Sequence, residues 1–248
     1  MHRFFCDQLA GLIPSGVPRL SGKDVPLLDA SVMLDAQESH HAVKVLRLKA
    51  GDAIELLDGR GHVAQGMIEE AGRKVRVKVS SVIRREPVSP RLDIATAIPK
   101  GPRADAMIEQ LSQLGVDRVI PLRTARSVVD PRDRKVERFA RAAIESAKQC
   151  GRAHVMHIEA PQDFSPSLLS GDHDLRLLAM PDGATEHERV RGAASILVLI
   201  GPEGGWTNEE IETAKAVGCV PWCIGPHVMR IETAAVAAAA IIRALTCP

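Results

Sequence analysis

Aromatic side chains are scarce in this sequence of 248 residues, which has four Phe, two Trp and no Tyr. A module that stacks RNA bases on a sheet needs several exposed aromatic rings, so the composition argues against that kind of platform. Long apolar runs are missing as well. No stretch approaches the roughly 20 residues that a membrane-spanning helix needs.

Cysteines are few, and their spacing suggests no pairing. The five lie at positions 6, 150, 219, 223 and 247, and no two form a CxxC pair. An odd set of this kind indicates neither a disulfide framework nor a zinc ribbon. Residues 1–7 lack the apolar segment of a signal peptide. We therefore expect a soluble, cytoplasmic protein.

Motifs of several common enzyme classes are also absent. The chain has no P-loop, no GxGxxG dinucleotide fingerprint, no GxSxG nucleophile elbow and no HExxH zinc motif. His154 and His157 are three residues apart, and on a strand such residues face opposite sides. We therefore expect no metal site.

Charge is spread unevenly along the chain, although the formal net charge is only +1. Residues 91–152 carry 13 basic and 8 acidic side chains, whereas residues 153–248 carry 6 and 12. Arginine outnumbers lysine by 23 to 9, and arginine suits bidentate phosphate contacts. A polyanionic partner is one interpretation, but charge alone favours an ordinary solvated surface.

The first part of the chain has the pattern of antiparallel strands. In segments 53–57, 62–68 and 74–79 apolar and polar residues alternate, and turns containing glycine separate them. We expect a small β-barrel over residues 1–85. Residues 86–91 include two prolines and are predicted to be a linker.

The second part alternates strands with helices, which indicates a parallel sheet covered by helices. Helices are expected to end at Gly115 and Gly218, and the second of these starts at a capping box, Thr207 to Glu210. The expected strands are 92–98, 116–122, 175–180, 195–200 and 220–224, and further helices are expected at 132–150 and 232–245.

Two glycine loops follow strands of this second part. Residues 201–205, Gly-Pro-Glu-Gly-Gly, come directly after one strand, and Gly225-Pro226 comes after another. In an open α/β sheet the ligand binds outside the carboxyl ends of the strands, and glycine lets the backbone approach it closely. Two such loops, the second leading to Arg230 and Glu232, predict a small-molecule site.

These loops and several further motifs resemble the bacterial RsmE family of SPOUT-class RNA methyltransferases. The most specific part is the pair of glycine loops followed by Arg230-x-Glu232-Thr233-Ala234. The resemblance extends over most of the chain, in the family's order, through residues 3–5, 40–52, 100–101, 114–122, 126–129 and 149–152.

The resemblance implies an N-terminal PUA-like RNA-binding β-barrel at 1–85, a linker at 86–91 and a SPOUT methyltransferase domain with a C-terminal trefoil knot at 92–248. It also implies S-adenosyl-L-methionine as methyl donor, a homodimer with sites at the interface and methylation of uridine N3 in 16S rRNA on the 30S subunit. Composition and spacing do not indicate the knot, because knots are very rare in proteins.

The resemblance and the loops together give a set of predicted site residues. The cofactor is expected to contact Met180, Pro181, Ile200, Gly201, Pro202, Glu203, Gly204, Gly205, Ile224, Gly225, Pro226, Val228, Met229 and Thr233. RNA is expected to contact Arg3, His40, Arg47, Arg126, Arg132, Arg134 and Lys135, with binding that weakens steeply as salt rises. Core packing is the alternative role for Met229, and a structural role is preferred for His41.

Methylation of uridine N3 requires loss of the N3 proton, which a base or a stabilising cation can assist. We expect Arg230, or Arg126 from a partner subunit, to stabilise the uridine anion. Glu232 would be the base or would orient the substrate. The alternative of equal weight is that Glu232 is simply an acid in a first helical turn, where the macrodipole favours it.

Two other functions stay open. His227 and Ile231 stand where the family usually has Arg and Thr, so one alternative is a non-catalytic rRNA-binding assembly factor of the same fold. The other is a SPOUT enzyme that acts on a different RNA nucleoside, for example at the ribose 2′-hydroxyl. Cofactor binding and the identity of the methylated nucleoside distinguish these possibilities.

Overall fold

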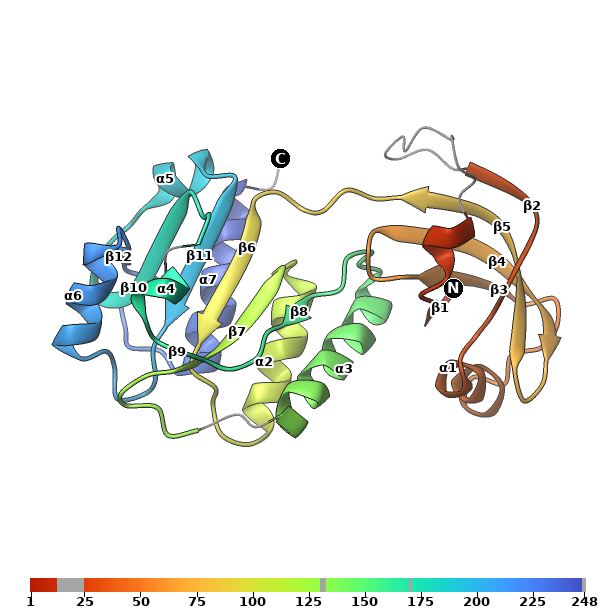
Figure 1. The fold of residues 1–248 in the computed structure, drawn as a ribbon, viewed down its shortest axis with the longest axis horizontal. Coiled ribbons are helices and arrows are strands. Elements are labelled where there is room, and N and C mark those ends of the chain that lie inside the picture. Colours follow the sequence, from red (N-terminus) through yellow and green to blue (C-terminus); the bar gives the residue numbers. More distant parts are fainter. Residues whose placement is uncertain (13–24, 130–132, 170, 247–248) are drawn as a thin grey trace. The chain divides into compact units, whose positions relative to one another are not determined.

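The structure is a computed structural model, and it describes residues 1–12, 25–129, 133–169 and 171–246. The chain forms two compact units. One consists of Met1–Pro87 together with Ala147–Val155, and the other of Val88–Ser146 together with Met156–Pro248. The first unit is therefore built from two separate stretches of chain (Figure 1).

The N-terminal unit is a five-stranded sheet in the order β1-β3-β4-β5-β2. All neighbours pair antiparallel except β1 and β3, which are parallel. Val75, Val77 and Val79 are buried and alternate with exposed basic residues, as predicted. The elements are β1 His2–Phe5, the 3₁₀-helix η1 Leu9–Leu12, β2 Val25–Met33, α1 Ala36–His40, the π-helix η2 His41–Val45, β3 Ala53–Leu57, β4 His62–Ala71 and β5 Val75–Arg84.

Residues Ala147–Val155 complete this unit through specific bonds. Lys148 and Glu38 form a buried ion pair, with 2.7 Å between Nζ and Oε1. Arg3 bonds to Glu55 at 2.5 Å and donates to the carbonyls of Lys148 and Gln149 at 3.2 Å each. The contacts with Lys148 and Gln149 join residues that lie more than a hundred positions apart in the sequence.

The C-terminal unit is built on a parallel sheet in the order β12-β10-β11-β6-β7-β8, with β9 also paired to β7. Its strands are β6 Arg91–Thr96, β7 Arg118–Arg123, β8 His157–Ile158, β9 Gln162–Asp163, β10 Leu175–Ala184, β11 Ser195–Ile200 and β12 Val220–Trp222. Its helices are α2 Pro102–Gln113, α3 Asp133–Cys150, α4 Pro166–Leu169, α5 His187–Gly192, α6 Asn208–Ala216 and α7 Ile231–Thr246. Helices α2 and α5 pack against α7 (Figure 1).

The strand predicted at 116–122 begins only at Arg118 in the structure, as β7. The amide of Val116 donates to the carbonyl of Leu111, so Val116 still belongs to the turn that ends α2. Strand β12 ends at Trp222, two residues before the predicted end at 224, although the amide of Cys223 still donates to the carbonyl of Ala184 on β10 at 3.0 Å. In the part of the chain that the structure describes, no helix is long and apolar enough to cross a membrane.

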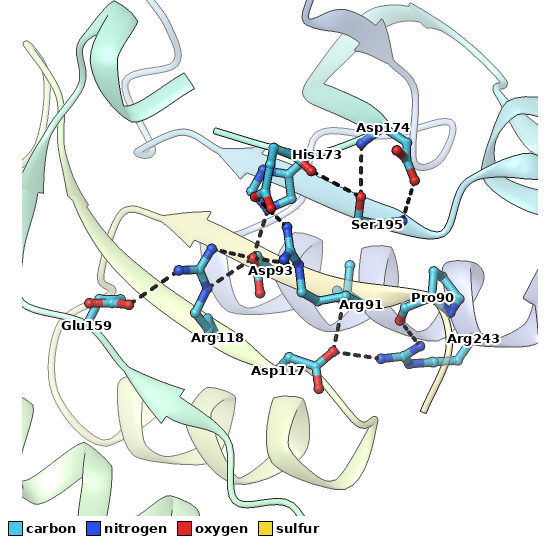
Figure 2. Close-up of polar contacts among 12 residues, drawn as sticks. Pro90, Arg91, Asp93, Asp117, Arg118, Glu159, His173, Asp174, Ser195 and Arg243 are labelled. Carbon is cyan, nitrogen blue, oxygen red and sulfur yellow. Dashed lines mark hydrogen bonds and ion pairs between the residues drawn. The ribbon is translucent and has the colours of Figure 1, made fainter. Parts of the chain in front are cut away.

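A buried ion cluster lies at the amino ends of these strands (Figure 2). Asp93 on β6 has no exposed surface, and its Oδ2 accepts from Arg118 Nε at 3.0 Å and Nη2 at 2.7 Å. Nε2 of His173 lies 2.8 Å from the same oxygen. Burial tends to raise the pKa of the Asp93 carboxyl, but the hydrogen bonds with His173 and Arg118 outweigh burial and lower the pKa.

The same edge of the sheet anchors the end of α7. Arg243 donates to the carbonyls of Leu114 at 3.1 Å and Pro90 at 2.7 Å, and its Nη2 lies 3.6 Å from Asp117 Oδ2. Asp117 also accepts from the amide of Leu92 at 2.8 Å. The start of β6, the end of α2 and the end of α7 are thus tied together by side chains (Figure 2).

Candidate active site

A pocket of about 290 Å³ lies at the carboxyl ends of β10, β11 and β12. Its wall contains every residue predicted to bind the cofactor except Gly204, Pro226 and Thr233. Six further lining residues were not predicted: Ala179, Trp206, Ile211, His227, Ile231 and Ala234. Trp206 directly follows the first glycine loop, and Ile231 and Ala234 share one face of α7, so both the position and the helical spacing were signals for them.

Two glycines of the pocket, Gly201 and Gly225, lie very close to other side chains of the pocket wall. A Cβ at Gly201 would lie 2.9 Å from the ring of Trp206, and a Cβ at Gly225 would lie 2.6 Å from the terminal methyl of Met229. A larger residue at 201 would collide with the rigid ring of Trp206, whereas at 225 it would meet only the flexible end of Met229. Glycine is therefore required at 201 if the Trp206 ring is to keep its place in the pocket wall.

Strand β10 departs from the sheet where it meets the pocket. Ala179 and Ala184 both register with Trp222 on β12, so residues 180–183 form a bulge between them. A Cβ at Gly183 would lie 2.5 Å from backbone atoms of Trp222. This close contact lets the bulge place Met180 and Pro181 in the wall of the pocket.

Trp206 connects three parts of the site. Its indole Nε1 donates to the carbonyl of Ala179 at 3.1 Å. Its ring packs against Phe164, with 5.4 Å between the ring centroids, and also lines the pocket. The position of this ring therefore depends on β10 as well as on its own loop.

Arg126 lies in the loop after β7 and contacts the glycine loop of its own chain. Its Nη1 donates to the carbonyls of Gly204 at 2.8 Å and Trp206 at 3.2 Å. Gly204 gives it room, since a Cβ there would lie 3.2 Å from the Cβ of Arg126. Action of Arg126 on uridine, from a partner subunit, stays a prediction.

Glu232 stands in the first turn of α7, between the lining residues Ile231 and Ala234. Its Oε1 lies 3.3 Å from Nη1 of Arg103, in the first turn of α2. Its Oε2 is buried and has no hydrogen-bond partner among the described residues. An unsatisfied buried acceptor costs about 1–3 kcal/mol. Glu232 itself is not among the residues that line the pocket, although its neighbour Ile231 is.

Arg103 was missed in the sequence, although a signal existed. A cation in the first turn of a helix is disfavoured by the macrodipole, and such a broken local rule often indicates a functional site. Arg230, by contrast, was predicted. It is exposed, and within the described part of the chain its guanidinium has neither a hydrogen-bond partner nor an ion-pair partner.

The residues predicted to bind RNA lie in both units. Arg3 is engaged by the bonds described above, and His40 is exposed at the end of α1. Arg47 is exposed and has a φ of 57°, the left-handed region that a non-glycine residue seldom adopts. The ring of His41 packs on Phe4 at 6.0 Å, which supports its structural role.

Two further residues predicted to contact RNA, Arg134 and Lys135, lie in the first turn of α3. Arg134 is exposed, and the Nζ of Lys135 lies 5.8 Å from the ring centroid of Phe139. Burial and the neighbouring Arg138 lower the pKa of Lys135. Arg132 lies outside the described residues.

Comparison with known proteins identifies the family. A model for an RNA methyltransferase domain matches residues 85–243, and a model for the PUA domain of RNA methyltransferases matches residues 34–79. Fold and pocket are accordingly those of an RNA methyltransferase with a PUA domain. A ribosomal RNA small subunit methyltransferase E from Synechocystis is 30% identical over 88% of this chain and 75% of its own length. The chain belongs to the ribosomal RNA small subunit methyltransferase E (RsmE) family.

Other relatives agree with this assignment. The methyltransferase E of Bacillus subtilis is 29% identical over 81% of this chain and 85% of its own length. A Legionella pneumophila protein described as a methyltransferase, solved with SAM bound, has a TM-score of 0.78 at 27% identity and covers 87% of this chain and 92% of its own. The methyltransferase E of Neisseria gonorrhoeae shows the same fold, with a TM-score of 0.82 at 22% identity and coverage of 99% and 98%. The predicted family and fold class are confirmed.

Proposed function

We propose that this protein transfers a methyl group from S-adenosylmethionine to N3 of a uridine in 16S rRNA, in the cytoplasm and on the 30S subunit. One observation carries the proposal beyond family membership. The wall of the pocket includes Met229 and Ile231, which flank the exposed Arg230 in the chain, and Ile231 is followed directly by Glu232, whose Oε2 has no partner among the described residues.

The residues of the pocket fit the cofactor. Glycine at 201 leaves room for the Trp206 ring in the pocket wall, and Met180, Ile224 and Met229 provide apolar walls. Backbone groups of the glycine loops can bind the polar parts of a nucleoside. When bound, S-adenosylmethionine supplies a methyl group made electrophilic by its sulfonium.

The chain's own residues supply the acid–base chemistry. Arg103 holds Oε1 of Glu232 at 3.3 Å, so that Oε2 accepts the proton of uridine N3. The guanidinium of Arg230 stabilises the negative charge that spreads over O2, N3 and O4 of the base. Arg230 can neutralise the charge on the base because its guanidinium has no other partner in the described part of the chain.

We further propose that the chain forms a homodimer and that its C-terminal segment is a trefoil knot. The rim of the pocket supports the dimer, because Val228 lines it and is 83% exposed. A partner subunit that covered Val228 would remove this apolar side chain from water. A second copy would close the pocket from water.

The test is methyl transfer from labelled S-adenosylmethionine to 30S subunits that lack the modification, followed by nucleoside analysis. We expect 3-methyluridine, and we expect Arg230→Ala to abolish its formation. Cofactor binding with transfer to another nucleoside would replace uridine N3 as the target. Absence of both binding and transfer would favour the non-catalytic assembly factor, for which the place of His227 in the pocket wall is the one favourable observation.

A further inference from the structure

Two loops at the carboxyl edge of the sheet are joined by side-chain bonds. The first is residues 124–127, after β7, and the second is residues 201–206, after β11. Arg126 in the first loop holds two carbonyls of the second, those of Gly204 at 2.8 Å and Trp206 at 3.2 Å. One guanidinium nitrogen therefore fixes the end of the glycine loop.

Glu210 connects the first loop to α6 independently. It is 8% exposed, and its two carboxylate oxygens have different partners. Oε2 accepts from the amide of Thr207 at 2.8 Å and completes the capping box of α6. Oε1 accepts from the amide of Ala125 at 2.9 Å. A capping box needs only one of these oxygens, so the bond to Ala125 is an additional function of this residue.

Trp206 carries the effect of both bonds into the pocket. Its carbonyl is held by Arg126, its indole is held by the carbonyl of Ala179, and its ring lines the pocket. Any displacement of residues 124–127 would release the carbonyl and change the wall that this ring forms.

We propose that Glu210 and Arg126 are positioning residues that set the shape of the cofactor pocket. Neither side chain is part of the pocket wall, and both act through Trp206 and the glycine loop. The inference rests on the proposed function of the pocket as the S-adenosylmethionine site. It gives Arg126 a role within its own chain that is separate from any contact with RNA.

Glu210→Gln is the sharpest test, because glutamine keeps one acceptor oxygen and presents an NH₂ group to the second backbone donor. We expect the Kd for S-adenosylmethionine, measured by isothermal titration calorimetry on the full chain, to rise about tenfold, as the loss of one hydrogen bond predicts. The kcat at saturating cofactor should stay within about twofold of the wild-type value. Arg126→Ala should weaken binding similarly, and the double variant should bind no more weakly than the weaker single variant.

Matched controls separate this effect from charge and from the cap. Glu209→Gln removes the same charge from an exposed neighbour in the same turn of α6 and should leave the Kd unchanged. Thr207→Val removes the hydroxyl that accepts from the amide of Glu210 at 3.2 Å. It should lower the melting temperature and leave the Kd unchanged, since the bond to Ala125 is kept.

A Glu210→Gln protein with wild-type affinity for S-adenosylmethionine would overturn the proposal. An Arg126→Ala protein with lower kcat and unchanged Kd would overturn it too, because that is the pattern of a residue acting on RNA. If Glu210→Gln does not fold, Ser127→Ala replaces it, since Oγ of Ser127 accepts from the amide of Thr124 at 2.9 Å and closes the first loop. Unchanged affinity in that variant would likewise refute the proposal. Cofactor titration needs no RNA, so failure of methyl transfer would contradict the proposed function alone.

Discussion

At the amino edge of the parallel sheet a carboxylate is buried and paired twice, whereas at the carboxyl edge a guanidinium is exposed and has no partner among the described residues. Asp93 has no exposed surface and shares one oxygen with Arg118 and His173 (Figure 2). At the other edge, Arg230 is exposed, and within the described part of the chain Glu232 is paired only with the partly exposed Arg103, at 3.3 Å. Stability and chemistry are thus assigned to opposite ends of the same strands, as open α/β sheets allow.

The difference has an energetic reason. A buried charge is tolerable only when it is paired, because desolvation of an unpaired charge costs several kcal/mol. Asp93 at the amino edge meets this condition through Arg118 and His173, and Glu232 at the carboxyl edge meets it through Arg103. Arg230 avoids the cost by being exposed, so variants at the two edges should change different measurements.

The largest effect is expected at the amino edge. Asp93→Asn removes the carboxylate that Arg118 and His173 share, and the free energy of unfolding should fall by about 3–5 kcal/mol. Urea denaturation measures this change. The Kd of Asp93→Asn for S-adenosylmethionine, measured without urea so that the variant is folded, should match that of the wild type. Loss of cofactor affinity in folded Asp93→Asn protein would show that the two edges are not independent.

An intermediate effect is expected at the carboxyl edge. Glu232→Gln should lower kcat by about a hundredfold, as removal of a general base does, and Arg103→Ala by about tenfold, with little change in the free energy of unfolding. Arg103→Lys should restore part of the rate. The double variant should equal Glu232→Gln alone, because Arg103 acts through Glu232.

The matched control for this pair is Arg191→Ala. Arg191 forms an exposed pair with Glu188 on α5, with 2.6 Å between Nη1 and Oε1, and exposed pairs of this kind contribute little. The kcat of the Arg191→Ala protein should equal that of the wild type. Additive losses in Arg103→Ala and Glu232→Gln would mean that the two residues act separately.

The smallest effect is a pH dependence that belongs to the amino edge. The pKa of Asp93 is lower in the folded protein than in the unfolded chain, where an Asp titrates at about 3.9. Its charge therefore stabilises the fold above that value, and the contribution is lost as pH falls through the lower native pKa. Urea denaturation at pH 5 and pH 3 should show a gap between wild type and Asp93→Asn that narrows at the lower pH. If the difference in free energy of unfolding between wild type and Asp93→Asn is the same at both pH values, the destabilisation comes from packing and not from the charge of Asp93.

Hydrophobic patterns in the sequence predicted those strands in which buried and exposed residues alternate, or in which successive residues are all buried. The alternation in 53–57 and the apolar run in 195–200 gave strands with the observed bounds, because one or both faces of these strands are buried. The glycine loops predicted most of the pocket wall, since a ligand at a strand's end needs close backbone approach. Short elements such as β8 and α4 were missed, because two or four residues carry no period.

Contacts between distant residues could not be predicted. Glu210 and Ala125 are 85 positions apart, and Arg103 and Glu232 are 129 apart. The capping box already accounts for a glutamate at position 210, so nothing in the sequence indicated its second hydrogen bond, to the amide of Ala125. Asp93 stood alone in an apolar strand, and its partners come from β7 and from the segment before β10.

The two-part composition of the N-terminal unit has a consequence for the order in which the protein can fold during synthesis. Its sheet is complete once β5 has left the ribosome, but Lys148, the partner of buried Glu38, is made some sixty residues later. Ala153, which packs on Leu57 and Val63, follows later still. The N-terminal unit must therefore wait for the first strands and helices of the methyltransferase unit, and an early fragment would expose the acidic group and the apolar patch that residues 147–155 later cover.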